Sequence, residues 1–213
     1  MRRFNGLSVD TSKKILLDVG AFFINADPTK GYKANVDAGK RLGATQGGGT
    51  FAANPETHYI KVDGMPENTK GMLVLDGWKP TLTLKMLETD SNNVKIALGA
   101  AKVEAATLDT QGYKKVSPKD EFEDSDYLEN VACATKIKGS NFPVWIVVHA
   151  AVSFGGLSWS FSDKGETVTD VTFNGHYTVG EDDEISAPPF EIYIPDDITD
   201  AQMAAALENA EVH

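Results

Sequence analysis

Alternation of apolar and polar residues is the dominant pattern of this chain, and it predicts strands. The clearest case is residues 81–87, where Leu82, Leu84 and Met86 share one face while threonine and lysine residues occupy the other. A period of two residues is typical of a strand with one buried face, and threonine suits a pleated surface. Comparable strand-like segments lie at residues 14–25, 58–62, 70–75, 127–137, 144–152, 157–161, 167–177 and 190–194.

Turn-forming residues separate several of these segments. Asp63-Gly64 and Asp76-Gly77 each follow a strand-like run and predict tight turns, and residues 163–165 predict another. Strands at such short spacings, with few helical patterns between them, indicate an antiparallel β-sandwich or barrel. The regular alternation of strand and helix that a Rossmann-type fold requires is missing from the pattern.

Helical patterns occupy two short segments. Asp90 or Ser91 can cap a helix that ends at Gly99. Residues 199–202 fit a capping box ahead of an alanine-rich segment that runs to about residue 208. We therefore expect one mainly β domain over residues 1–195 with one short flanking helix, followed by a C-terminal helical tail at residues 196–213.

The widest gap in the strand pattern lies at about residues 27–57. It contains a glycine-rich stretch with few core-type residues. Loops this long inside a compact domain are uncommon, and they are typically functional or mobile. We interpret the gap as a flexible arm that becomes ordered against another molecule. The residues expected to make that contact are Leu42, Gly43, Gln46, Gly47, Gly48, Gly49, Thr50 and Phe51.

Charge is distributed unevenly along the 213 residues, whose formal net charge is −11. Residues 1–119 carry 17 basic and 12 acidic residues, a net of +5, whereas residues 120–213 carry 3 and 19, a net of −16. The overall acidity argues against a general nucleic-acid binder, which needs a basic face. The polarity could orient copies of the chain head to tail. Alternatively, the fold mixes both halves on every face.

Motifs that could carry catalysis are incomplete. Residues 43–50 have the glycine spacing of a phosphate-binding loop, but Gly49 stands where the lysine is required. The four histidines do not fall at metal-ligand spacings, and Cys133, the only cysteine, lies in an apolar stretch where a thiol typically packs as a small hydrophobe. We expect no enzymatic activity, no metal and no cofactor. Residues 142–152, the longest apolar run, fall short of the about twenty residues that a membrane-spanning helix needs.

The three tryptophans leave a binding function open. Trp78, Trp145 and Trp159 could form a platform that stacks on sugars, which would make the chain a carbohydrate- or receptor-binding β-sandwich. The competing interpretation is that Trp145 and Trp159 anchor the core, because each lies in an otherwise apolar strand. Trp78, between a glycine and Lys79-Pro80, is then the surface tryptophan and could serve an interface.

Several segments, taken in order, resemble the major tail proteins that form the tail tube of long-tailed bacteriophages. The first half contributes "LGATQGGGTFAANPETHYIKV" from residue 42, Asp63-Gly64, and "KGMLVLDGWKPTLTLKMLE" from residue 70. The second half contributes "FGGLSWSF" from residue 154, "DKGE" from residue 163, "VTDVTFNGHYTV" from residue 168 and "PPFEIY" from residue 188. The resemblance spans roughly residues 42–195, and it depends on the order of these motifs.

The resemblance implies a structural virion protein with a tail-tube β-sandwich fold. In that family six copies form a ring whose inner strands join into one barrel, and rings stack along the tail. A long loop and the termini reach the neighbouring ring, a role that the resemblance assigns here to the arm at residues 42–51. The implied partners are other copies of the chain, the tape-measure protein, the tail terminator and the baseplate or tip proteins.

The resemblance also implies a virion location, after synthesis in a host cytoplasm, and a lumen through which DNA passes without specific binding. Walls of such tubes tend to be electronegative. We therefore expect some residues of the acidic second half to line the lumen, although the pattern does not single them out. A tail terminator or a contractile-type tube is a related possibility.

Overall fold

Antiparallel pairing organises most of the chain. The computed structural model describes residues 11, 14–66, 68–138, 140–161, 163–180 and 184–196. The helical elements are the 3-10 turn η2 (Pro28–Lys30), α1 (Gly31–Asp37), α2 (Ser91–Leu98) and the 3-10 turn η3 (Asp124–Asp126). The strands are β1 (Leu16–Ile24), β2 (Thr45–Tyr59), β3 (Leu73–Met86), β4 (Ala101–Leu108), β5 (Gln111–Pro118), β6 (Leu128–Ile137), β7 (Pro143–Ser153), β8 (Thr169–Asn174), β9 (Thr178–Val179), β10 (Ile185–Ala187) and β11 (Phe190–Tyr193). The prediction of a mainly β, antiparallel fold is confirmed.

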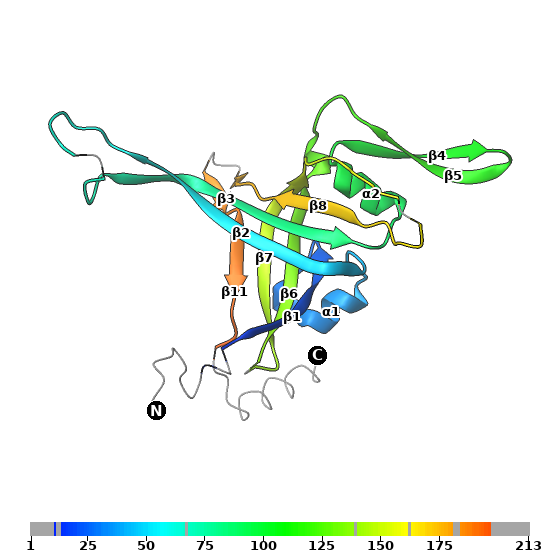
Figure 1. The fold of residues 1–213 in the computed structure, drawn as a ribbon, viewed down its shortest axis with the longest axis horizontal. Coiled ribbons are helices and arrows are strands. Elements are labelled where there is room, and N and C mark those ends of the chain that lie inside the picture. Colours follow the sequence, from blue (N-terminus) through cyan, green and yellow to red (C-terminus); the bar gives the residue numbers. More distant parts are fainter. Residues whose placement is uncertain are drawn as a thin grey trace.

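One seven-stranded sheet folds over itself to make two layers. Its order is β1-β6-β7-β8-β3-β2, and β11 pairs with β7 as an additional strand. We call β1, β6, β7 and β11 the first layer, and β2, β3 and β8 the second layer. The end of β7 joins them, because Val152 and Ser153 pair with β8. Figure 1 shows β2 and β3 crossing in front of β6 and β7.

The core lies between the two layers. Leu82, Leu84 and Met86 on β3 are buried, together with Val171 and Phe173 on β8. They pack against first-layer side chains that include Phe22, Val131 and Val148. The predicted alternation over residues 81–87 is therefore correct. Complete burial of one such side chain contributes about 1.5–3 kcal/mol to folding.

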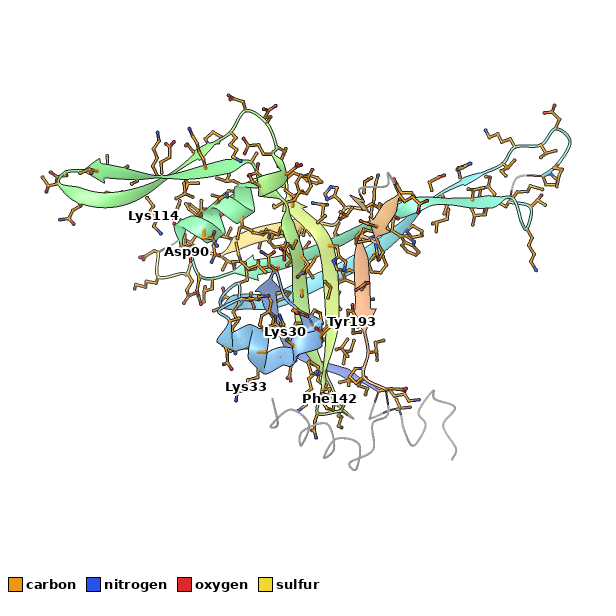
Figure 2. The ribbon with its side chains drawn as sticks, turned by 180° about the vertical axis from the view of Figure 1, so that it is seen from behind. Lys30, Lys33, Asp90, Lys114, Phe142 and Tyr193 are labelled. Atoms are coloured by element: carbon orange, nitrogen blue, oxygen red, sulfur yellow. The ribbon has the colours of Figure 1, made fainter. Side chains whose placement is uncertain are left out.

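The opposite face of the first layer is also covered. Phe23 and Trp145 pack there with Val36 of α1 as a second apolar cluster, and the Phe23 and Trp145 ring centroids lie 5.4 Å apart. Figure 2, seen from behind, shows α1 with Lys33 labelled. Because both faces of the first layer are buried, β7 reads as a nearly continuous apolar run rather than an alternating one.

Helix α1 contradicts the interpretation of residues 27–57 as one long loop. Its buried residue, Asn35, accepts a hydrogen bond from Asp27 N at 2.8 Å and donates to the carbonyl oxygens of Asp27 and Gly31 at 2.7 and 2.8 Å. These bonds satisfy backbone groups at the start of the helix. Most of β2 also falls in this range, so the predicted gap is filled by regular structure.

Helix α2 has the predicted limits. The Asp90 side chain caps it by accepting hydrogen bonds from Asn92 N and Asn93 N at 2.8 and 2.7 Å. Gly99 ends it with a φ of +73°. Ser153 Oγ donates to Ala97 O at 3.0 Å, which ties α2 to the end of β7.

Two other local predictions are wrong. Asp76-Gly77 is not a turn, because β3 continues through it; Asp76 is an extra residue of β3, a bulge opposite the Glu56–Thr57 step of β2. Residues 157–161 do not form a strand; Trp159 instead donates from Nε1 to Thr169 Oγ1 at 2.8 Å. The predicted helix at residues 199–208 and nearly all of the tail at 196–213 lie outside the described residues.

Candidate assembly surfaces

The β2–β3 hairpin is much longer than the body that it covers. Its far part, residues 56–76, extends away from the two layers (Figure 1), and we call it the projecting hairpin. Asp63-Gly64 lies in the loop at the tip of this hairpin, and the turn predicted there is confirmed. The projecting hairpin carries large apolar side chains that are at least 40% exposed, namely Tyr59, Ile60, Val62, Met65, Leu73 and Leu75.

The two faces of the projecting hairpin differ in polarity. Tyr59 pairs with Leu73, and Thr57 pairs with Leu75, so these residues share one face. Tyr59, Leu73 and Leu75 make an apolar stripe along it. On the other face, His58 Nδ1 lies 2.7 Å from Asp76 Oδ1. The ribbon is amphipathic although it has no core of its own, which is a pattern typical of a segment that meets another surface.

Trp78 anchors the base of the projecting hairpin. Its ring packs against Phe190 of β11 with centroids 5.6 Å apart, and its backbone N–H donates to Tyr177 Oη at 2.9 Å. Trp145 is only 4% exposed, as the core interpretation expected, and so cannot contribute to a sugar-stacking platform. The hypothesis of a three-tryptophan platform is therefore wrong.

The glycine-rich stretch at residues 42–51 lies against the body. Leu42 is buried in the core, and its N–H donates to Phe22 O at 2.9 Å. At Gly49, an added Cβ would lie 2.6 Å from Phe22 Cζ and 2.8 Å from Thr83 O. Glycine is required here for close approach, so this stretch is packed against the body rather than an open loop, and its role as an arm stays a prediction.

The other residues predicted for the arm lie just before β2 or in its first half. Gly47 and Gly48 have φ values of +85° and +76° and lie at a register shift between Thr45 and Gly49. Gly43 lies next to the Glu88 side chain. Gln46 and Thr50 are exposed, and Phe51 packs against Phe190 with ring centroids 5.7 Å apart. Whether any of these residues contacts another subunit stays a prediction.

A second hairpin also leaves the body. Strands β4 and β5 pair over their full length, from Ala101 with Pro118 to Leu108 with Gln111. Leu108 and Tyr113 are exposed on it. Figure 1 shows this hairpin and the projecting hairpin extending in opposite directions. The molecule therefore offers contact surfaces on two sides.

Strand β1 is an open edge of the first layer with exposed apolar residues. Its partner strand is β6, with a register shift between Leu17 and Ala21, and the end of its other side is bridged by residues 40–42, through the Phe23–Arg41 pair and the bond from Leu42 N to Phe22 O. The open part of this edge is therefore the first half of the strand. Leu16 and Val19 are 55% and 59% exposed. An unpaired edge with apolar side chains is a template for pairing with another chain, and the bulge restricts where pairing can occur.

One buried ion pair holds the acidic loop between β5 and β6. Lys119 Nζ lies 2.8 Å from Asp126 Oδ1, and the Asp126 side chain is fully buried. Burial tends to raise the pKa of Asp126, but hydrogen bonds from Lys119 and from Glu123 N outweigh burial and hold the pKa below its ordinary value. Glu123 also accepts from Lys119 at 2.7 Å. These contacts give Glu123 and Asp126, two of the acidic residues in this loop, a structural role.

Side chains placed to act as metal ligands or nucleophiles are few in the described part of the chain. No cluster of three or more His, Cys, Asp or Glu residues there could hold a metal ion. Burial raises the pKa of Cys133 to about 11, so its thiol is a poor nucleophile at neutral pH. None of the helices described has the length and apolar character to span a membrane.

A scan against models of known protein families and a search of curated proteins both find no match for the chain. Its interpretation therefore depends on the sequence motifs and on the geometry of these surfaces.

Proposed function

We propose that the chain is a structural subunit that polymerises as stacked rings, six copies to a ring, into the tail tube of a long-tailed bacteriophage. The observation that carries the proposal is the apolar stripe on the projecting hairpin. An isolated two-stranded ribbon is marginally stable in water, and apolar side chains exposed at 41% (Tyr59), 51% (Leu73) and 52% (Leu75) add little stability to it. A neighbouring subunit would bury them.

The geometry favours a head-to-tail contact between copies. The projecting hairpin points away from its own body, so its stripe meets a different surface on the next molecule, which is the condition for an open filament. The net charges of +5 and −16 in the two halves of the sequence support the same orientation. In this proposal the projecting hairpin takes the role that the resemblance gave to residues 42–51.

The size of the stripe suits controlled assembly. Each half-exposed side chain contributes on the order of 1 kcal/mol when it becomes buried. A single hairpin contact is therefore weak, whereas several contacts made at once by one ring act together. Free subunits would remain apart until a ring presents all its hairpins.

The wider assignments depend on the resemblance. The chain would act in the virion as the conduit for DNA ejection, with no reaction to catalyse. Its partners would be the tape-measure protein, which occupies the lumen before ejection, the tail terminator, and the baseplate or tip proteins.

The test is negative-stain electron microscopy of the purified chain across a range of concentrations, with light scattering on the same samples. Wild-type protein should form hollow tubes or rings of about six subunits. The Leu73→Asp/Leu75→Asp variant should remain monomeric with an unchanged unfolding temperature, because both side chains lie outside the core. Val74→Asp, on the opposite face of the same ribbon, is the matched control and should assemble.

Two outcomes contradict the proposal in different ways. Wild-type protein that remains monomeric at every concentration, and that binds glycans in a screen, would favour the carbohydrate-binding alternative. Tubes that form equally well from the double aspartate variant would leave the tube assignment intact and refute the role of the projecting hairpin.

A further inference from the structure

The second layer has one face that no described element of the chain covers. On β3, Leu82 and Leu84 point into the core, whereas Thr81, Thr83 and Lys85 alternate with them and point outward. Residues paired across an antiparallel sheet share a face, so the register extends this outward face to the neighbouring strands. Its members are Thr50, Ala52, Asn54 and Glu56 on β2, Lys79, Thr81, Thr83 and Lys85 on β3, and Asp170, Thr172 and Asn174 on β8.

Many polar groups on this outward face are paired with one another. The hydroxyl oxygens of Thr83 and Thr172 lie 2.9 Å apart, within hydrogen-bond distance. Lys85 Nζ lies 3.9 Å from Asp170 Oδ1, and Lys79 forms an ion pair with Glu56. Two cations therefore balance two carboxylates, and the remaining side chains are small and uncharged.

The other surfaces of the body differ from this one. The outer face of the first layer is buried beneath α1, where Trp145 is only 4% exposed. Beyond Gly77 an extra residue of β3, Asp76, shifts the register, and Leu75 and Leu73 pair with Thr57 and Tyr59. The apolar stripe therefore continues the core-facing side of the ribbon and lies on the side opposite the outward face. The same ribbon thus presents a water-compatible, self-paired surface on one side and, beyond the body, an apolar surface on the other side, which separates a solvent-facing side from a protein-contacting side.

From this contrast we infer that the outward face of the second layer lines the bore of the tube, and that α1 lies on the outside. The inference rests on the proposed function. It assigns to the bore a charge-balanced wall of small hydroxyl and amide groups, with Asp170 as the one described acidic residue that β8 supplies to it. This differs from the expected wall of acidic residues drawn from the second half of the chain.

Such a wall suits the passage of a polyanion. Binding to DNA depends on cations that displace its counterions, and here each lysine on the face has a carboxylate partner. Hydroxyl groups that bond to each other also offer fewer free donors to phosphate oxygens. The wall would neither hold the DNA nor depend on long-range repulsion, which salt screens over about 8 Å.

The test is thiol labelling with a matched pair of variants, Lys85→Cys in the outward face and Lys33→Cys on α1 (Figure 2). Both lysines are exposed, and buried Cys133 should remain unlabelled at neutral pH. Each variant is labelled with biotin maleimide, assembled into tubes and incubated with streptavidin. Streptavidin should decorate intact Lys33→Cys tubes along their walls, and intact Lys85→Cys tubes should remain bare until they are dissociated.

The outcomes separate this inference from the proposed function. Streptavidin along the walls of intact Lys85→Cys tubes would overturn the inference while the tube itself stands. If the labelled Lys85→Cys protein does not assemble although wild type does, Thr50→Cys repeats the measurement at a second exposed position of the same face. If wild-type protein forms neither tubes nor rings, the proposed function fails, and this inference fails with it.

Discussion

The two ends of the β2–β3 hairpin share one antiparallel ladder but differ in what surrounds them. Over the body, Leu84 is 0% exposed and packs in the core between the layers. Beyond Gly77, Leu75 on the same strand is 52% exposed. Backbone pairing resumes beyond the bulge at this boundary and continues on both sides of it, so hydrogen bonding does not distinguish the two ends. The difference lies in burial, and it indicates that one end stabilises the subunit while the other is available to a neighbour.

The largest expected effect compares leucines from the two ends. Leu84→Ala should lower the free energy of unfolding by about 3 kcal/mol, because it leaves a cavity in a closed core. Leu75→Ala should lower the stability of the free subunit by less than about 0.5 kcal/mol, since its side chain is largely in water. Urea denaturation of both variants under non-assembling conditions measures the difference. Similar losses of stability in the two variants would contradict the distinction between an end of the hairpin that stabilises the subunit and an end that does not.

The next effect tests why the body end is rich in glycine. Gly49→Ala should destabilise the subunit by about 2 kcal/mol, because the new methyl group would overlap Phe22 and the Thr83 carbonyl. Gly112→Ala is the control, as no atom lies within 4 Å of its added Cβ, and its stability should stay within about 0.5 kcal/mol of wild type. Thermal unfolding monitored by circular dichroism reports both. An unchanged Gly49→Ala variant would revive the interpretation of a flexible arm.

A smaller effect is expected where α2 closes the body. Asp90→Ala removes the side chain that caps the first turn and should cost about 1 kcal/mol. Asp90→Asn, which keeps an acceptor oxygen, should recover most of the loss. The capped helix is not part of the projecting hairpin. Tube formation, observed by electron microscopy, should therefore be unchanged at temperatures where the variant is folded.

The last effect is acid sensitivity of the loop between β5 and β6. The pKa of Asp126 is lowered in the folded chain, so its ionised form stabilises folding above the ordinary value of 3.8, and that stability is lost as pH falls through the folded value. Unfolding temperatures measured from pH 6 downward should fall below about pH 4. Asp126→Asn should start lower and decline less steeply; a decline equal to that of wild type would assign acid sensitivity to other groups.

Local patterns predicted the elements whose stability is local. The alternation at residues 81–87 identified the part of β3 that is buried on one face, and Asp90 and Gly99 correctly bounded α2 because capping depends on neighbours in the chain. Helix α1 escaped prediction because the Asn35 side chain and a contact with the first layer hold it, rather than an apolar period. Asparagine within a run of small and polar residues reads as loop.

The candidate surfaces were predicted less well than the strands. The strand-like segments at 58–62 and 70–75 and the turn at Asp63-Gly64 correspond to the projecting hairpin, but their pattern does not say that the hairpin leaves the body. Glycine has the same appearance in a flexible loop and at a close contact, so the stretch at residues 42–51 was assigned mobility in place of tight packing against Phe22.

Alternation and capping are short-range properties, and for that reason the amino-acid order alone was enough to specify a mainly β, antiparallel chain with a short helix at Ser91–Leu98. Which apolar residues enter the core and which remain outside depends on the partner across the sheet and on where the opposing layer ends. A strict alternation would place Leu84 and Leu75 on opposite sides of one strand, but the extra residue at Asp76 brings them to the same side. Only the packing of the first layer beneath Leu84, and its absence beneath Leu75 among the described residues, makes one a core residue and the other a candidate contact.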